Sequence, residues 1–285
     1  MALQEARGPV APSRSLFALL QYSFAALVAL VVIVPLVAAV INGFKSTGEL
    51  LLHPFGMPET WLWDNYTTIL RSASFWRQMR NSVIVMVATA LGVVVLSAMP
   101  AFVFSRMTFR GRELLFNFFT LGLLFPLTVA ILPVYIALRQ INLVDSLLGV
   151  ILPQIAFGVS GNILILRGFF ATVPRELDEA AAIDGCSPAG FFVRVLLPLM
   201  RPALAAVVVL TLVASWNNFF LPLLVLNSEQ LYTLPLGIMQ FQGRFGTDWG
   251  KVLAFVSLAL LPTVAFYLLA ERQIIAGLTA GAVKG

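Results

Sequence analysis

The chain has 285 residues, of which 60% are hydrophobic and 11% are charged, and its formal net charge is +5. A soluble domain has about 25% charged residues, so this composition excludes an ordinary soluble protein and is typical of a chain that crosses a membrane several times. The basic residues flank apolar runs and form no stripe, which argues against a nucleic-acid-binding protein.

Six apolar runs follow a polar arm at residues 1–15, and each run is close to the roughly 20 residues that cross a bilayer as a helix. We therefore predict an all-α fold, a polytopic integral membrane protein with six transmembrane helices within residues 16–272 and a tail at residues 273–285. The predicted spans are residues 16–41, 83–104, 114–138, 147–166, 203–226 and 252–270.

The basic residues between the spans predict the orientation. Six spans place both termini, the turn at 105–113 and the loop at 167–202 on one side, where eleven Lys and Arg residues lie, against seven on the other side. Short loops that are rich in Lys and Arg stay in the cytoplasm. We therefore expect a multi-pass membrane protein whose termini and 167–202 loop are cytoplasmic.

The 167–202 loop contains an acidic stretch at residues 175–198, with four of the thirteen acidic residues of the chain. Three of these acids follow Pro174, which is a favourable first residue of a helix, and the helix dipole stabilises acids in that place. Gly185 is a natural helix end, and Ser187 and Pro188 suit the start of a second helix that ends at Pro198. The pattern predicts two short helices bent at Gly185, the second of them anchored by apolar side chains. These are Phe191, Phe192, Val195 and Leu196.

The same stretch resembles a motif of a known transporter family. Glu179-Ala180-Ala181, Gly185 after three residues and Leu197-Pro198 follow the EAA-loop pattern Glu-Ala-Ala-x3-Gly-x9-Ile-x-Leu-Pro of ABC import permeases, with Val195 in place of the usual isoleucine. Segments 166–170, 201–204 and 215–219 strengthen the match. The last nine residues are similar to the tail of carbohydrate-uptake permeases of the maltose-transporter type. The resemblance extends from about Asn65 to the C-terminus.

The resemblance implies a permease subunit of an ATP-driven importer that forms half of the path for a sugar or oligosaccharide. It implies a location in the inner (plasma) membrane and three kinds of partner besides membrane lipid: a second permease subunit, two ATP-binding cassette subunits, and an external or periplasmic solute-binding protein. ATP and Mg would be bound by the ATPase subunits, so no cofactor and no metal are expected in this chain. The residues expected to couple to the ATPase are Glu179, Ala180, Ala181, Asp184, Gly185, Leu197 and Pro198. The tail residues expected to contact the ATPase are Gly277, Leu278, Thr279, Gly281 and Lys284.

Several polar residues lie inside predicted spans. Such side chains either form hydrogen bonds between helices or line the path of the solute. The candidates for the translocation path are Gln154, Asn162, Trp216, Asn217 and Asn218. No Asp, Glu, Lys or Arg lies in the middle of a span, which suits a neutral hydroxylated solute and disfavours a secondary transporter driven by an ion gradient. A permease for another small solute, such as a polyamine, is the alternative.

Enzyme activity is not expected. The chain has no Gly-x4-Gly-Lys-Ser/Thr phosphate loop, and it has one cysteine and one histidine. These counts leave no disulfide within the chain and no cluster of Cys and His residues for a metal ion. His53 is expected to be an ordinary residue of a surface loop.

Overall fold

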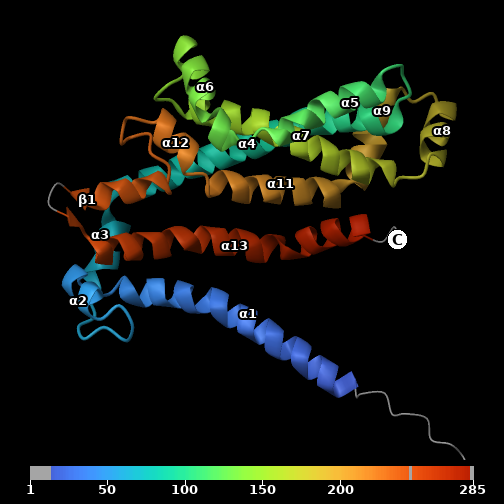
Figure 1. Ribbon diagram of the computed structural model, residues 1–285. Coiled ribbons are helices and arrows are strands. Elements are labelled where there is room, and N and C mark those ends of the chain that lie inside the picture. The colour runs from blue at the N-terminus through green and yellow to red at the C-terminus, as the bar shows by residue number, and fades with distance from the viewer. Residues whose placement is uncertain (1–13, 244–245, 283–285) are drawn as a thin grey trace, which may run out of the picture.

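The computed structural model describes residues 14–243 and 246–282, which form a helical bundle with one short pair of strands. Figure 1 shows the long helices side by side, with α2 and α3 at one end and α8 and α9 at the other. The α-helices are α1 (Arg14–Asn42), α2 (Thr47–Leu52), α3 (Asp64–Arg71), α4 (Ala73–Arg106), α5 (Arg112–Leu121), α6 (Leu127–Gln140), α7 (Leu147–Ala171), α8 (Glu176–Ile183), α9 (Pro188–Phe191), α10 (Leu197–Leu199), α11 (Arg201–Trp216), α12 (Phe220–Val225) and α13 (Trp249–Ala282). The remaining elements are the 3-10 segments η1 (Gly122–Leu124) and η3 (Leu236–Phe241), the π segment η2 (Phe192–Leu196), and the strands β1 (Gln242–Gly243) and β2 (Gly246–Thr247), which pair antiparallel.

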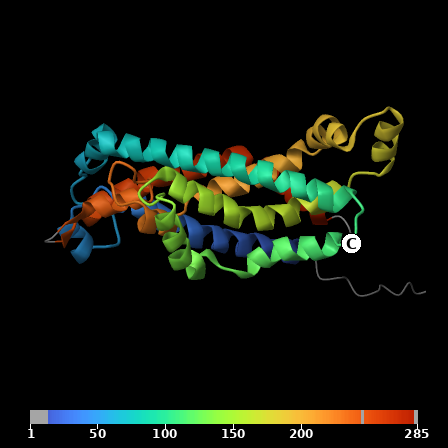
Figure 2. The ribbon, with the colours of Figure 1, turned by 90° about the horizontal axis from the view of Figure 1, so that it is seen from above.

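The centre of the bundle is the pair α4 and α7, which pack along much of their length, as Figure 2 shows from above. Helix α11 packs against α4, and α13 packs against α11. A side chain at Gly158 of α7 would place its Cβ 2.8 Å from a methyl carbon of Val93 on α4. A glycine there lets the two backbones approach closely, as small residues do between membrane helices.

Helix α1 lies outside this core. Its apolar stretch Phe17–Asn42 has no buried residue, and it packs against α13 near the α2 end of the molecule. Figure 1 shows α1 diverging from α13 toward its N-terminal end. A helix that is apolar all round is stable in lipid or against another apolar surface, so α1 fits a membrane span.

The predicted class of membrane protein is confirmed, with differences at the ends of the spans. Helices α1, α4, α7 and α13 are each long and apolar enough to cross a membrane. Two bent pairs of helical segments are also long and apolar enough when each pair is counted as one span. Helix α4 begins at Ala73, well before residue 83, because Ser72 caps it by accepting the N–H of Phe75 at 3.2 Å. Helix α13 continues to Ala282, through most of the predicted tail at 273–285.

The third predicted span, 114–138, is sharply bent. The chain forms α5 and η1, turns by 97° and continues as α6. The turn lies at Pro126, and Phe125 before it is extended, with φ −98° and ψ 103°. Proline disfavours a helical conformation in the residue that precedes it, which explains the position of the break.

The fifth predicted span, 203–226, is also interrupted. Helix α11 ends at Trp216, and α12 begins at Phe220. Asn217 donates to the carbonyl of Val213 at 3.0 Å, and Asn218 accepts the N–H of Leu221 at 3.3 Å. The two asparagines therefore lie at helix ends. The amide of Asn218 binds the N–H of Leu221 in the first turn of α12, and the amide of Asn217 adds a second donor to the Val213 carbonyl, which also accepts the N–H of Asn217.

Candidate functional site

The turn at Gly185 is the structure that its sequence predicts. Gly185 has φ +75°, in the left-handed region that favours glycine. The N–H of Cys186 donates to the carbonyl of Ala181 at 2.8 Å, and the N–H of Gly185 donates to that of Ala182 at 3.0 Å. These two bonds form a Schellman motif, which ends α8 and turns the chain away from it.

The second helix begins as predicted but ends later. Ser187 accepts the N–H of Gly190 at 3.2 Å, and Pro188 occupies the first turn of α9. The helical run then continues through η2 and α10 to Leu199, so the prediction that Pro198 ends the helix is wrong. The π segment η2 lies just before Pro198, and Leu197 donates to Phe192 five residues back. π turns are rare and occur mostly as single-turn bulges inside α-helices, and this one lies next to a proline, which lacks the N–H of a regular helical turn.

The predicted anchoring of the second helix is confirmed. Phe191 is 4% exposed and Leu196 is fully buried, in a cluster with Phe102 of α4 and Phe170 of α7. Phe192 and Val195 pack partly buried against the same cluster. By contrast, α8 has no buried residue. Its exposed residues, with those of the turn that follows, include Glu179, Ala180, Ile183, Asp184 and Gly185.

Arg106, the last residue of α4, ties α8 to the bundle. Its Nη1 lies 3.2 Å from Oδ2 of Asp178, and its Nη2 donates to the carbonyl of Val173 at 2.8 Å. The side chain of Arg106 is only 4% exposed. From the sequence, Arg106 is recognised only as one of the basic residues that set the orientation, because no local pattern links it to Asp178, 72 positions away.

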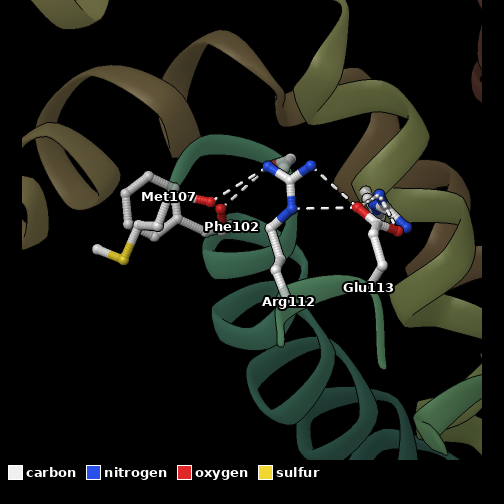
Figure 3. Close-up of polar contacts among 6 residues, drawn as sticks. Phe102, Met107, Arg112 and Glu113 are labelled. Atoms are coloured by element: carbon white, nitrogen blue, oxygen red, sulfur yellow. Dashed lines mark hydrogen bonds and ion pairs between the residues drawn. The ribbon is translucent and has the colours of Figure 1, made fainter. Parts of the chain in front are cut away.

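A second charged group joins α5 to α7 at the same end of the molecule. Glu113 accepts two bonds from Nη2 of Arg167, at 2.7 and 2.9 Å, and its carboxylate lies 2.9 Å from Nη2 of Arg112. Figure 3 shows Arg112 between Glu113 and Met107, whose carbonyl it contacts at 3.3 Å. The guanidinium of Arg167 also lies 3.7 Å above the centre of the Phe116 ring. These contacts hold the start of α5 against the end of α7.

A cavity of about 370 Å³ lies between α7 and α11, and its lining is mostly apolar surface with several amide and hydroxyl side chains. Gln154 is its most constrained polar residue: Oε1 accepts Ser215 at 2.6 Å and Thr89 at 3.4 Å. Its Nε2 is buried and has no acceptor among the described residues. Asn162 and Asn218 also line the cavity. The Nε2 group is therefore a buried hydrogen-bond donor without an acceptor, on a residue that lines the cavity.

The five path residues predicted from the sequence are not all together. Trp216 and Asn217 line a different cavity, of about 220 Å³, between α11 and α13. Trp216 is 3% exposed and packs edge-on against Phe266, with ring centres 5.6 Å apart. Sequence reasoning missed Thr89, because a threonine in a long apolar helix has no distinguishing local pattern.

Two other predictions concern metal ions and the tail. Among residues 14–243 and 246–282, no group of three or more His, Cys, Asp or Glu side chains is close enough to hold a metal ion. The backbone of Gly277, Leu278, Thr279 and Gly281 belongs to α13, but their side chains lie outside the described residues, as does Lys284.

Comparisons with known proteins agree with this architecture. Residues 93–274 match the family described as "binding-protein-dependent transport system inner membrane component". The chain is 32% identical over 270 residues to the diacetylchitobiose uptake system permease protein NgcG of Streptomyces coelicolor, covering 94% of this chain and 89% of that protein. It is 30% identical over 278 residues to the arabinooligosaccharides transport system permease protein AraQ of Bacillus subtilis, covering 96% and 98%.

A solved structure shares the fold. It is the crystal structure of a bacterial ABC transporter involved in the import of the acidic polysaccharide alginate, with a TM-score of 0.78 and 19% identity, covering 93% of this chain and 99% of that one. The match to the family extends over most of the bundle, including α8 and the turn at Gly185. This chain belongs to the family of binding-protein-dependent transport system inner membrane components.

Proposed function

We propose that this chain is one of two permease subunits of an ATP-driven importer and forms half of the path for a neutral sugar or oligosaccharide. The observation that carries the proposal is the contrast within one loop: α8 has no buried residue, whereas Phe191 and Leu196 of the second helix are buried against α4 and α7. An exposed helix fixed to a buried base is suited to receive a partner and to pass its movement to the bundle.

The chemistry of the cavity supports a neutral solute. Its lining contains amides and hydroxyls, among them Gln154, Asn162 and Thr211, and no charged side chain. A polyhydroxylated solute needs hydrogen-bond donors and acceptors, and the free Nε2 of Gln154 is one donor. Two relatives are named for the uptake of diacetylchitobiose and of arabinooligosaccharides, which are uncharged glycans. A polyamine permease would need acidic groups to bind its cationic solute.

The partners and the orientation belong to the same proposal. The ATPase subunits would contact the exposed surface around Glu179, Asp184 and Gly185, together with the tail at 273–285. The external binding protein would deliver solute at the α2 end of the molecule. Both termini would be cytoplasmic, and the chain would hydrolyse no ATP itself.

The coupling role is tested by two substitutions on the exposed surface. Gly185→Val forces a β-branched residue into the left-handed region, at a cost of roughly 1–2 kcal/mol, and adds bulk to the docking surface. Glu179→Lys reverses a charge on α8 and touches no buried group. Each variant should insert normally, and each should weaken capture of the ATPase subunit or uncouple ATP hydrolysis from solute uptake.

Glu59→Lys is the matched control, because it makes the same charge change at an exposed residue far from α8, between α2 and α3. It should leave ATPase capture at the level of the unmodified chain. If Gly185→Val and Glu179→Lys behave like this control at equal membrane levels, α8 is only a solvated connector and the coupling proposal fails.

The solute path is tested at Gln154. Gln154→Leu removes the free donor and should raise the solute concentration for half-maximal uptake about tenfold, the value of one lost hydrogen bond of about 1.4 kcal/mol. Capture of the ATPase should not change. Asn217→Ala, in the other cavity, should leave uptake unchanged. Equal uptake by the Gln154 variant and the unmodified chain would exclude this cavity from the path.

The orientation is tested with Cys186, the only cysteine of the chain. A membrane-impermeant thiol reagent should not label it in intact cells and should label it in inside-out vesicles from which the ATPase has been removed. Labelling in intact cells would place the 167–202 loop outside.

A further inference from the structure

An uncharged apolar segment covers the last residues of α2 and those that follow it, at the end of the bundle opposite α8 (Figure 1). Residues 50–58 contain no Asp, Glu, Lys or Arg. Four of them, Leu51, Leu52, Phe55 and Met57, expose 74%, 76%, 90% and 70% of their surface, and we call these four the apolar tip. Single exposed apolar residues are normal on a protein surface, but four large ones within seven positions mark a surface that something covers.

The position of the apolar tip is fixed by hydrogen bonds to the end of α1. Asn42, the last residue of α1, donates from Nδ2 to the carbonyl of Pro54 at 3.1 Å. Lys45 is fully buried, and its Nζ donates to the carbonyl of His53 at 2.9 Å. The segment therefore folds back to the level at which the apolar span of α1 ends, and it cannot extend freely into the water.

An aromatic cluster lies beside the same end of α1. The ring of Phe44 lies 5.1 Å from Trp61, 4.8 Å from Trp63 and 4.4 Å from Tyr66, measured between ring centres. Trp61 and Trp63 remain 45% and 63% exposed. Tryptophan and tyrosine are enriched where membrane meets water, because one part of each ring is apolar and another is polar. The cluster places the boundary of the bilayer at the level of the apolar tip.

We propose that the apolar tip is immersed in the lipid bilayer, at the boundary between headgroups and acyl chains, in the leaflet where α1 ends. Its surface continues the lipid-compatible surface of α1, which has no buried residue. Glu49 and Glu59 border the uncharged segment, so docking to a soluble binding protein is the competing explanation that the test must separate from immersion. The immersed tip fixes the depth of α1 in the bilayer.

The test measures the environment of position 55 in the complete transporter, reconstituted in phosphatidylcholine vesicles. In a Cys186→Ser background, Phe55→Cys is labelled with an environment-sensitive fluorophore. The matched control is Glu59→Cys, an exposed position on the same loop. The label at position 55 should be quenched by nitroxides on the lipid acyl chains and shielded several-fold from iodide in the water. The label at position 59 should show the opposite pattern.

Three results would overturn the proposal. Iodide quenching at position 55 as strong as at position 59 would place the tip in water. Shielding from iodide that appears only when the binding protein is added would make the tip a protein-docking site. Shielding from both iodide and lipid nitroxides in its absence would place the tip against the second permease subunit. Because position 55 contacts no buried group, the substitution itself is not expected to disturb folding.

Discussion

The two arms of the loop on either side of Gly185 are attached to the bundle by different physical means. The arm from α9 to α10 inserts Phe191 and Leu196 into a cluster shared with α4 and α7. The α8 arm has no fully buried residue, although Ala181 packs partly buried against this cluster, and its charged attachment is the contact of Asp178 with Arg106. Burial resists displacement in every direction because the interior is closely packed, whereas a polar contact resists mainly the separation of its two partners.

This difference assigns two roles within one short segment. An element with few buried contacts opens or shifts at low free-energy cost, and elements that move are drawn from this class. The buried arm is therefore the fixed base and α8 is the displaceable part. Each of the following substitutions tests one side of that comparison.

The largest effect is expected for Leu196→Ala. Leu196 is fully buried, and truncating a buried leucine costs about 2–5 kcal/mol, partly through the cavity that it leaves. Thermal unfolding of the purified chain should shift clearly to lower temperature. Val193→Ala, on the exposed side of the same arm, should change stability by less than about 0.5 kcal/mol. Equal shifts for the two variants would mean that the second arm is not anchored by burial.

Arg106→Gln should have a smaller effect, because it removes one attachment and leaves the base intact. The carbonyl of Val173 loses its charged donor, a loss of about 1–3 kcal/mol for a buried group. Asp178→Asn should cost less, since Asp178 is 32% exposed. If the pair acts as a unit, the double variant should cost less than the sum of the two single variants.

Arg106→Lys separates charge from geometry in the same experiment. Lysine keeps the positive charge but lacks the forked guanidinium that reaches Asp178 and Val173 together. Compared with Arg106→Gln, Arg106→Lys should recover part of the lost stability and a smaller part of the lost solute uptake. Full additivity of the Arg106 and Asp178 variants would show that α8 is held by other contacts.

Ser187→Ala should cost about 1 kcal/mol, the usual value of a lost N-cap bond. Ser187 accepts the N–H of Gly190 and so fixes the start of the second arm. The expected result is a modest drop in unfolding temperature with ATPase capture largely retained. A drop as large as that of Leu196→Ala would show that the cap, and not burial, holds this arm.

Ile183→Ala should have the smallest effect on stability, within about 0.5 kcal/mol, because Ile183 is 86% exposed. The proposed coupling role predicts that the same variant weakens capture of the ATPase subunit, since an exposed isoleucine on α8 offers apolar contact area to a partner. A normal level of capture would remove Ile183 from the docking surface without affecting the stability argument.

Short-range chemistry explains which parts of the fold could be predicted from the sequence. The α8–Gly185–α9 turn depends on residues within ten positions of each other: the left-handed Gly185 and the cap at Ser187 are local features. The span at 16–41 follows from apolar length alone. The break at Pro126 was less visible, because apolar composition measures the length of a span and not its direction.

The candidate site depends more on long-range packing. Arg106 and Asp178 are brought together by the packing of the 167–202 loop on α4, and Thr89 meets Gln154 through the packing of α4 on α7. Single-sequence patterns contain no information about such pairs. Gln154, Asn162 and Asn218 were found as polar residues in apolar runs, whereas Trp216 and Asn217 satisfied the same criterion and lie on another side of α11.

The attachment of Arg106 also has a mechanical consequence for α4. Arg106 is the final residue of this helix, and Thr89 lies seventeen residues earlier, about 25 Å along the axis at 1.5 Å per residue. Helix α4 therefore connects two contacts: the Arg106–Asp178 pair at its C-terminal end and the Thr89–Gln154 hydrogen bond within its length. Pro100 lies between these two contacts, and a proline inside a helix is a usual position for a kink. A force applied to α8 while the Arg106–Asp178 pair stays closed would act on the helix that contributes Thr89 to the cavity lining.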